Sequence, residues 1–143
     1  MAIRSAKGTL VQLGNGASPQ VYSTIGQVRA IAGPSTKAIV QDVTTHSTAG
    51  NWKEQLATLI DPGSMTFPIN YDSADATHAF ATGLWLSLIN LTEDAFKVVL
   101  PGAHGTMLFN GYIASHSFTL PVDNVIQAAI EILINGAISA SNP

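Results

Sequence analysis

The segment DVTTHSTAGNWKE, residues 42–54, contains an acid, a base and a hydroxyl within six positions: Asp42, His46 and Ser47. A nucleophilic triad needs the acid to orient the base and the base to contact the nucleophile. In an extended strand, Asp42 and His46 would share a face but lie about 13 Å apart, with Ser47 on the other face. The chain also lacks the G-x-S-x-G sequence of a nucleophile elbow. We therefore interpret these residues as ordinary loop polarity, and a hydrolase that uses them is the least favoured alternative.

Other chemical sites receive no support from residue spacing. A zinc site would need closely spaced ligands such as H-E-x-x-H, and the four histidines are scattered. The turn sequence GNGASP, residues 14–19, lacks the third glycine of a dinucleotide fingerprint and the lysine of a P-loop. We predict no catalytic, metal-binding or cofactor-binding residues. The histidines are His46, His78, His104 and His116.

The composition indicates that much of the surface is covered by other protein. Charged residues make up 10% of the 143-residue chain and apolar residues 46%, whereas an ordinary soluble domain has about 25% charged residues. No apolar stretch approaches the roughly 18 to 20 residues of a membrane-spanning helix. The N-terminal residues 1–13 show no signal peptide. We expect synthesis in the cytoplasm, no membrane association and an obligate assembly.

The charge and cysteine counts narrow the function further. A net charge of −3 and six scattered basic residues argue against sequence-independent nucleic-acid binding. The chain has no cysteine, which excludes disulfides and thiolate metal sites. Its length suits one domain, and we expect residues 1–143 to form a single unit.

The first half of the chain is predicted to form four strands. Residues 8–33 contain two β segments around Asn15-Gly16, a pair that favours a tight hairpin turn. Residues 36–45 give a third segment rich in β-branched side chains. Residues 64–71 then alternate, and Pro68 predicts an edge strand or a bulge because it has no amide hydrogen to donate.

The remainder combines one helix with three further strands. Apolar spacing after Asp72 and Asp75 predicts a helix at residues 73–88. Strand patterns follow at residues 94–101, 106–122 and 124–139, and Gly111 predicts a bend by which one strand serves two sheets. The fold class is α+β, mainly β: a β-sandwich or barrel with one flanking helix. In the last strand one face holds Ile126, Ala128, Ile130, Ile132 and Ile134, and the other holds Gln127, Ala129, Glu131 and Leu133.

The long segment from His46 to Gly63 shows no sustained strand alternation, although WKEQLATLI could form a short helical turn. Loops of this length are usually functional or disordered. Two interpretations stay open: the loop folds back so that its apolar side chains join the core, or it is a contact arm that orders against a neighbour. The large apolar side chains concerned are Trp52, Leu56, Leu59 and Ile60.

Four segments carry a resemblance to a known family. They are GNGASP (14–19), DVTTHS (42–47), DPGSMTFPINYD (61–72) and FNGYIAS (109–115). In this order, and over nearly the whole chain, the sequence resembles the major tail tube proteins of long-tailed, lambda-type bacteriophages, the siphoviruses.

The resemblance implies a tail tube fold in a structural virion protein without catalysis. Six copies would form a homohexameric ring whose inner sheets join into one barrel, and rings would stack around a tape measure protein, bounded by tail tip and terminator proteins. DNA would pass through the lumen during genome ejection without specific binding. The loop at about 43–63 would join rings, with Trp52 as the main anchor; its other contact residues would be Leu56, Leu59, Ile60 and His46.

The resemblance also sets expectations about charge and about the chain's end. Glu131 is our candidate for a lumen-facing acid, because an acidic lining repels a passing duplex. Some family members carry a C-terminal immunoglobulin-like domain, which we do not expect here. Two alternatives remain beside a phage tail tube: a tube subunit of a phage-derived injection or secretion device, and a small β-sandwich that binds a ligand.

Overall fold

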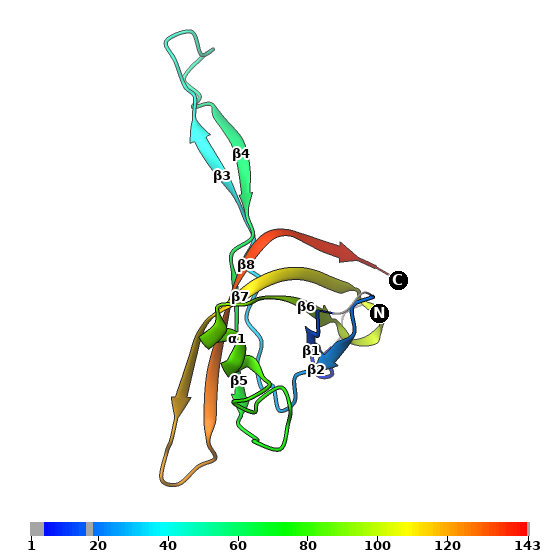
Figure 1. The fold of residues 1–143 in the computed structure, drawn as a ribbon. Coiled ribbons are helices and arrows are strands. Elements are labelled where there is room, and N and C mark those ends of the chain that lie inside the picture. Colours follow the sequence, from blue (N-terminus) through cyan, green and yellow to red (C-terminus); the bar gives the residue numbers. More distant parts are fainter. Residues whose placement is uncertain (1–4, 17–18, 143) are drawn as a thin grey trace.

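The computed structural model describes residues 5–16 and 19–142. It confirms the predicted fold class, since the chain is mostly β with one short α-helix beside the sheet (Figure 1). No helix in the described ranges is long and apolar enough to cross a membrane. The elements are β1 (Leu10–Gly14), β2 (Tyr22–Thr24), β3 (Lys37–Asp42), β4 (Gln55–Asp61), β5 (Ser64–Asn70), α1 (Leu84–Asn90), β6 (Glu93–Val99), a 3-10 turn (Pro101–Ala103), β7 (Thr106–Thr119) and β8 (Gln127–Ser141).

Six strands form one bent antiparallel sheet in the order β2-β1-β6-β7-β8-β5. The segment 25–35 connects its two ends: the Ile25 amide donates to the Val11 carbonyl at 2.8 Å, and Ala32 exchanges two 2.9 Å bonds with Thr66. The sheet and this segment enclose the core as a barrel-like body. β3 and β4 form a separate two-stranded sheet.

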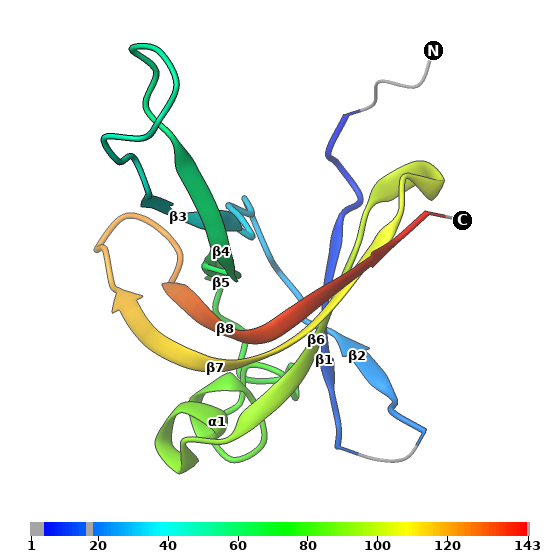
Figure 2. The same ribbon diagram turned by 90° about the horizontal axis from the view of Figure 1, so that it is seen from above.

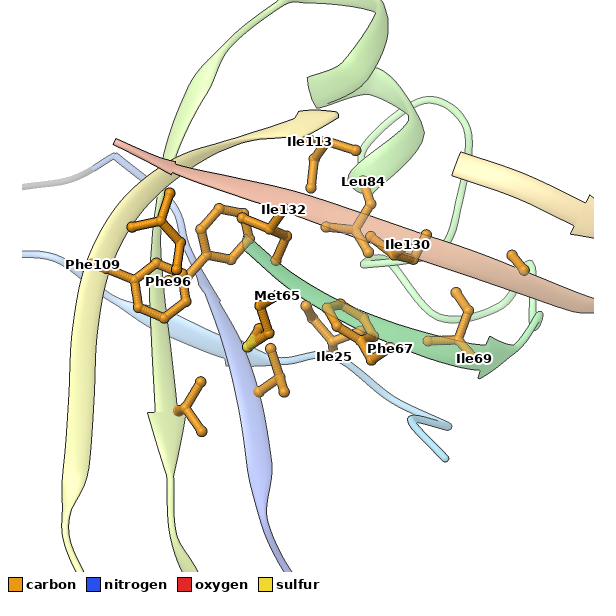
Figure 3. Close-up of a cluster of buried hydrophobic side chains, with 14 residues drawn as sticks. Ile25, Met65, Phe67, Ile69, Leu84, Phe96, Phe109, Ile113, Ile130 and Ile132 are labelled. Atoms are coloured by element: carbon orange, nitrogen blue, oxygen red, sulfur yellow. The ribbon is translucent and has the colours of Figure 1, made fainter. Parts of the chain in front are cut away.

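The core lies between the inner faces of this body (Figure 3). Met65, Phe67 and Ile69 of β5 are at most 1% exposed, which confirms the alternation predicted for that strand. On β8 the predicted apolar face is buried from Ala128 onward, whereas Ile126 precedes the strand and is exposed. The buried apolar residues are Val11, Ile25, Met65, Phe67, Ile69, Leu84, Phe96, Val98, Phe109, Ile113, Ala128, Ile130, Ile132 and Ile134.

Pro68 lies where its missing amide hydrogen costs no ladder bond. β5 is the edge strand of the sheet, as predicted. The neighbouring amides of Thr66 and Asn70 point away from β8, toward segment 25–35. The Pro68 nitrogen faces the same way because alternate residues of a strand present their amides to the same side. There its carbonyl accepts a 3.0 Å bond from the Arg29 amide.

The helix predicted at residues 73–88 is wrong in its first two thirds, because α1 spans only Leu84–Asn90 and turns precede it. Side chains in the turns form hydrogen bonds with backbone amides that would otherwise be available to a helix. The Asp75 carboxylate accepts the Thr77 amide at 2.9 Å, and the His78 ring accepts the Asp72 amide at 3.0 Å. Such local bonds compete with helix formation.

Two further expectations need correction, and one is confirmed. The second β segment is only β2, followed by isolated bridges at Val28 and Ala32. The hairpin between β1 and β2 forms as predicted, with Ala17 and Ser18 of its turn outside the described residues. β7 serves one sheet rather than two, and its ladder with β8 shifts on either side of Gly111 instead of at it.

The prediction that residues 46–63 lack a strand is also wrong. β4 (Gln55–Asp61) pairs with β3 from Lys37↔Asp61 to Asp42↔Gln55. The register shifts between Ile39 and Val40, which leaves Thr58 as an extra residue in β4. This bulge breaks the alternation, because residues before and after it change faces.

Candidate assembly surfaces

The hairpin of residues 37–61, here called the arm, projects away from the barrel-like body (Figures 1 and 2). It consists of β3, β4 and the connecting segment 43–54. Every residue of β3 and all but Asp61 of β4 are exposed. The arm therefore does not fold back to join the core.

Both faces of the arm are apolar. One face carries the pair Ile39↔Leu59 and the other carries Ala38↔Ile60. Leu59 is 69% and Ile60 73% exposed, and Leu56 beyond the bulge is 56% exposed. Isolated two-stranded hairpins are marginal in water, and contiguous apolar surface of this kind marks an interaction site.

The end of the arm is held by threonine side chains. The Thr44 hydroxyl accepts the Glu54 amide at 2.8 Å and donates to the Glu54 carbonyl at 3.1 Å. The Thr48 hydroxyl accepts the Thr45 amide at 3.0 Å. Trp52 lies in this end and is 82% exposed, so the largest apolar ring of the arm faces solvent.

Asp42, His46 and Ser47 are all exposed and do not converge into a triad. The Asp42 carboxylate accepts the Thr44 amide at 2.9 Å and lies 3.9 Å from the Lys53 ammonium. Hydrogen bonds from Thr44 hold the pKa of Asp42 below its usual value. These partners are local to the arm and stabilise its end.

Among the strand edges that have no strand partner within the described chain, two belong to the long strands β7 and β8. β6 ends its pairing with β7 at Glu93↔Tyr112, so within the described chain Ile113–Thr119 of β7 has no strand on that side. β5 ends its pairing with β8 at Ser64↔Leu133, which leaves Asn135–Ser141 of β8 without a β5 partner. Open edges present unpaired backbone groups to other chains.

On strands β5, β7 and β8, the sheet face opposite the core carries very little charge, whereas β6 adds Glu93 and Lys97 to that face. Glu131 is the one Asp, Glu, Lys or Arg among the residues of β5, β7 and β8. It is half-buried and lies opposite Thr66 of β5 and Ser115 of β7. These three strands therefore present mainly uncharged side chains, among them the exposed Leu108, Tyr112 and Leu133.

An aromatic cluster between β7, α1 and the preceding turns was not predicted from sequence. Phe80 lies 5.5 Å from Trp85 and 6.0 Å from Phe118, measured between ring centroids. His116 lies 5.3 Å from Trp85 and 4.9 Å from Phe118. Its two ring nitrogens are buried without a hydrogen-bond partner among the described residues. Burial, with a smaller contribution from the charge of His78, lowers the pKa of His116 below its usual value.

The described residues offer little to a small ligand or metal. Cavities of about 630 and 470 Å³ are lined mainly by aliphatic and glycine residues, the larger one also by Lys7 and Arg29, and neither has an aromatic wall. Within residues 5–16 and 19–142, no three His, Asp or Glu side chains lie close enough together to hold a metal ion. His78 is buried for a structural reason, because its second ring nitrogen bonds the Gly26 carbonyl at 2.7 Å.

Comparison with solved structures finds the same fold in chains from a tail, a tail tube and a sheath-tube complex. A chain from the tail of an empty gene transfer agent particle is 22% identical, with a TM-score of 0.80 over 97% of this chain and 99% of the other. The SPP1 tail tube protein is 9% identical, with a TM-score of 0.71 over 94% and 77%. A chain of the sheath-tube complex of an extracellular contractile injection system is 9% identical, with a TM-score of 0.71 over 99% and 93%. No family model and no curated protein matches the sequence.

Proposed function

We propose that this chain is a structural protein of a bacteriophage tail tube, made in the host cytoplasm and incorporated into the virion. The observation that carries the proposal is the combination of this fold with an apolar arm and two open strand edges on one chain. These surfaces do not stabilise a monomer, whereas contacts between copies in a polymer would bury them. The low charge content of the sequence supports the same conclusion.

Ring closure would use the open edges. The edge of β7 at Ile113–Thr119 would pair with an edge strand of the next copy, so that inner sheets join around the ring. A heterologous contact that closes by rotation forms a ring. Six copies per ring agrees with the C6 symmetry used to describe the gene transfer agent tail.

The lightly charged sheet face suits a channel lining. With Glu131 facing the lumen, each ring of six would present six carboxylates among the mainly uncharged side chains of these strands. Acidic groups repel the phosphates of a duplex, and the absence of basic side chains in these strands removes sites where it would adhere. DNA would thus pass without specific binding.

Further partners follow from this role. A tape measure protein would occupy the lumen before DNA passage, and tail tip and terminator proteins would bound the stack. The arm would join successive rings through Trp52, Leu56, Leu59, Ile60 and His46, all of which are exposed.

The proposal is tested by negative-stain electron microscopy of the purified protein over a concentration series. Hollow rings or tubes are expected at high concentration, and their end-on views count the copies per ring. Dispersed monomers at every concentration, even with a tail-tip complex added as an initiator, would support the ligand-binding alternative instead.

A tube subunit of a phage-derived injection device is the second candidate, favoured by the likeness to chains of the anti-feeding prophage baseplate and of the contractile injection system. Purified particles that contain this chain distinguish the two functions. Particles with a DNA-filled head identify a phage tail, and headless particles without DNA identify an injection device.

A further inference from the structure

A second exposed apolar surface lies at the connection between β7 and β8. Val122 is fully exposed, Leu120 is 69% exposed, and Phe80 contributes from the neighbouring turns. We call this surface the terminal patch. Its residues are Phe80, Leu120, Val122, Val125 and Ile126.

The terminal patch is continuous with the aromatic cluster. The Tyr71 amide donates to the Ile126 carbonyl at 2.9 Å, and the Tyr71 ring stacks on Phe80 with centroids 5.6 Å apart. Phe118, two residues before Leu120, lies 6.0 Å from Phe80. The part of the patch formed by Phe80 and Ile126 is thus joined to packed rings, whereas Leu120 and Val122 extend into solvent.

The arm and the terminal patch lie at opposite ends of the molecule (Figure 1). The β7–β8 connection is at the lower end of that view, and the arm extends from the upper end. A surface at one end that fits a different surface at the other end gives a heterologous contact, which adds copies along an axis without closing.

We propose that the arm of one copy docks on the terminal patch of a second copy in the adjacent ring. This inference rests on the proposed tail tube function and identifies the surface that receives the arm. Ile39, Leu56 and Leu59 would pack against Leu120, Val122 and Ile126.

Area and charge both support a second copy as the occupant. From the exposed fractions, the face of the arm with Ile39, Leu56 and Leu59 offers on the order of 300 Å² and the terminal patch on the order of 600 Å²; each is smaller than the roughly 800 Å² that a partner gives to a stable pairwise interface, but several such contacts would act together between two rings. The six side chains named in the contact are uncharged, and the exposed Asp123 beside Val122 would lie at the rim of the contact, in water.

Disulfide trapping tests the contact directly, because the natural chain has no cysteine. The double variant Leu59→Cys, Val122→Cys should yield a ladder of linked chains after mild oxidation of assembled material. Each single variant should yield no ladder. A double variant that cross-links no more than the single variants overturns the inference.

Complementation gives a second test. Leu59→Asp and Val122→Asp should each form rings but no tubes, with the concentration needed for tubes raised at least about tenfold. Mixing the two variants should produce paired rings, because one intact arm surface then meets one intact terminal patch. Leu91→Asp is the matched control, since Leu91 is 77% exposed but lies outside both surfaces.

The outcomes separate the inference from the function on which it rests. Wild-type rings and tubes, together with normal tubes from Val122→Asp, contradict the docking site alone. Wild-type protein that forms neither rings nor tubes contradicts the tail tube function and the docking site with it. Thermal unfolding monitored by circular dichroism confirms that each variant remains folded.

Discussion

Strands β4 and β5 follow one another in the chain and are both seven residues long, yet their environments are opposite. In β5, Met65 and Phe67 are at most 1% exposed and alternate with residues on the outer face. In β4, Leu59 and Ile60 are about 70% exposed on opposite faces of the arm. The apolar side chains of β5 therefore stabilise the folded monomer, whereas the similar side chains of β4 are available to stabilise an assembly.

The difference lies in the pattern as well as in the composition. A strand with one apolar face buries that face against a single core, and its alternation of apolar and polar residues indicates which face is buried. A hairpin that is apolar on both faces needs partners on both sides, which its own chain does not provide. Substitutions in the two strands should therefore affect different measurements.

The largest effect is expected in β5. Phe67→Ala should lower the free energy of unfolding by about 3–5 kcal/mol, because it removes a fully buried ring from the core. Urea denaturation under conditions that keep the protein monomeric measures this loss. Leu59→Ala is the matched control and should change monomer stability by less than about 0.5 kcal/mol. Equal losses in both variants would contradict the division between body and arm.

The next largest effect concerns Trp52. Trp52→Ala should leave the monomer folded and weaken ring stacking by about 2 kcal/mol per contact, as expected for a buried interface tryptophan. Sedimentation velocity over a concentration series detects the shift from stacked to free rings. His46→Ala, in the same exposed segment, should have a smaller effect. A Trp52→Ala protein that sediments like the wild type would remove Trp52 as the anchor.

A smaller effect is expected on the stability of the barrel-like body at acidic pH. Because burial lowers the pKa of His116 in the folded state, the unfolded state binds more protons as pH falls below the ordinary histidine pKa of about 6.5. The stability of the wild type should therefore be highest above that pH and should fall as the pH drops toward the folded-state pKa. His78 is the neighbouring titratable group that affects this value.

His116→Phe removes this ionisation while keeping an aromatic ring beside Trp85 and Phe118. Urea midpoints at pH 7.5 and 5.5 should differ less for His116→Phe than for the wild type. Comparing the two proteins at each pH cancels the contribution of Asp94, whose pKa burial raises. Identical pH dependence in both proteins would show that His116 ionises as easily when folded as when unfolded.

The smallest effect is expected at the ion pair of the arm. Lys53→Met removes the 3.9 Å contact with Asp42, in which both side chains are exposed. Exposed pairs contribute little, so the monomer's unfolding free energy should change by less than about 0.5 kcal/mol. Denaturation at low and high salt checks this value, and a larger change would indicate that the arm is coupled to the body.

The sequence predicted those parts of the fold that repeat locally. β5 and the first half of β8 alternate about one core, so their faces were predicted correctly, and Pro68 correctly indicated an edge. The helix was predicted too long because apolar spacing does not reveal that Asp75 and His78 bond to nearby backbone atoms. β4 was missed because the bulge at Thr58 and its two apolar faces remove alternation.

The candidate surfaces were predictable in part. Apolar residues in a long irregular segment indicated the arm, but only the three-dimensional structure shows that they are exposed on a hairpin. The aromatic cluster was not predictable, because Tyr71, Trp85 and His116 come from separate elements that the fold brings together. The terminal patch was missed for the same reason, since Phe80 and Val122 are distant in sequence.

The threonine bonds at the end of the arm have a consequence for the energetics and rate of association. A segment that must fold as it binds loses conformational entropy at that moment, which weakens and slows association. In the arm, Thr44 already ties the two sides together through Glu54, and Thr48 closes the turn. The arm is therefore preorganised for contact. Its docking should be limited by the encounter between rings, and the free energy of burying Trp52 and its neighbours should go largely into affinity.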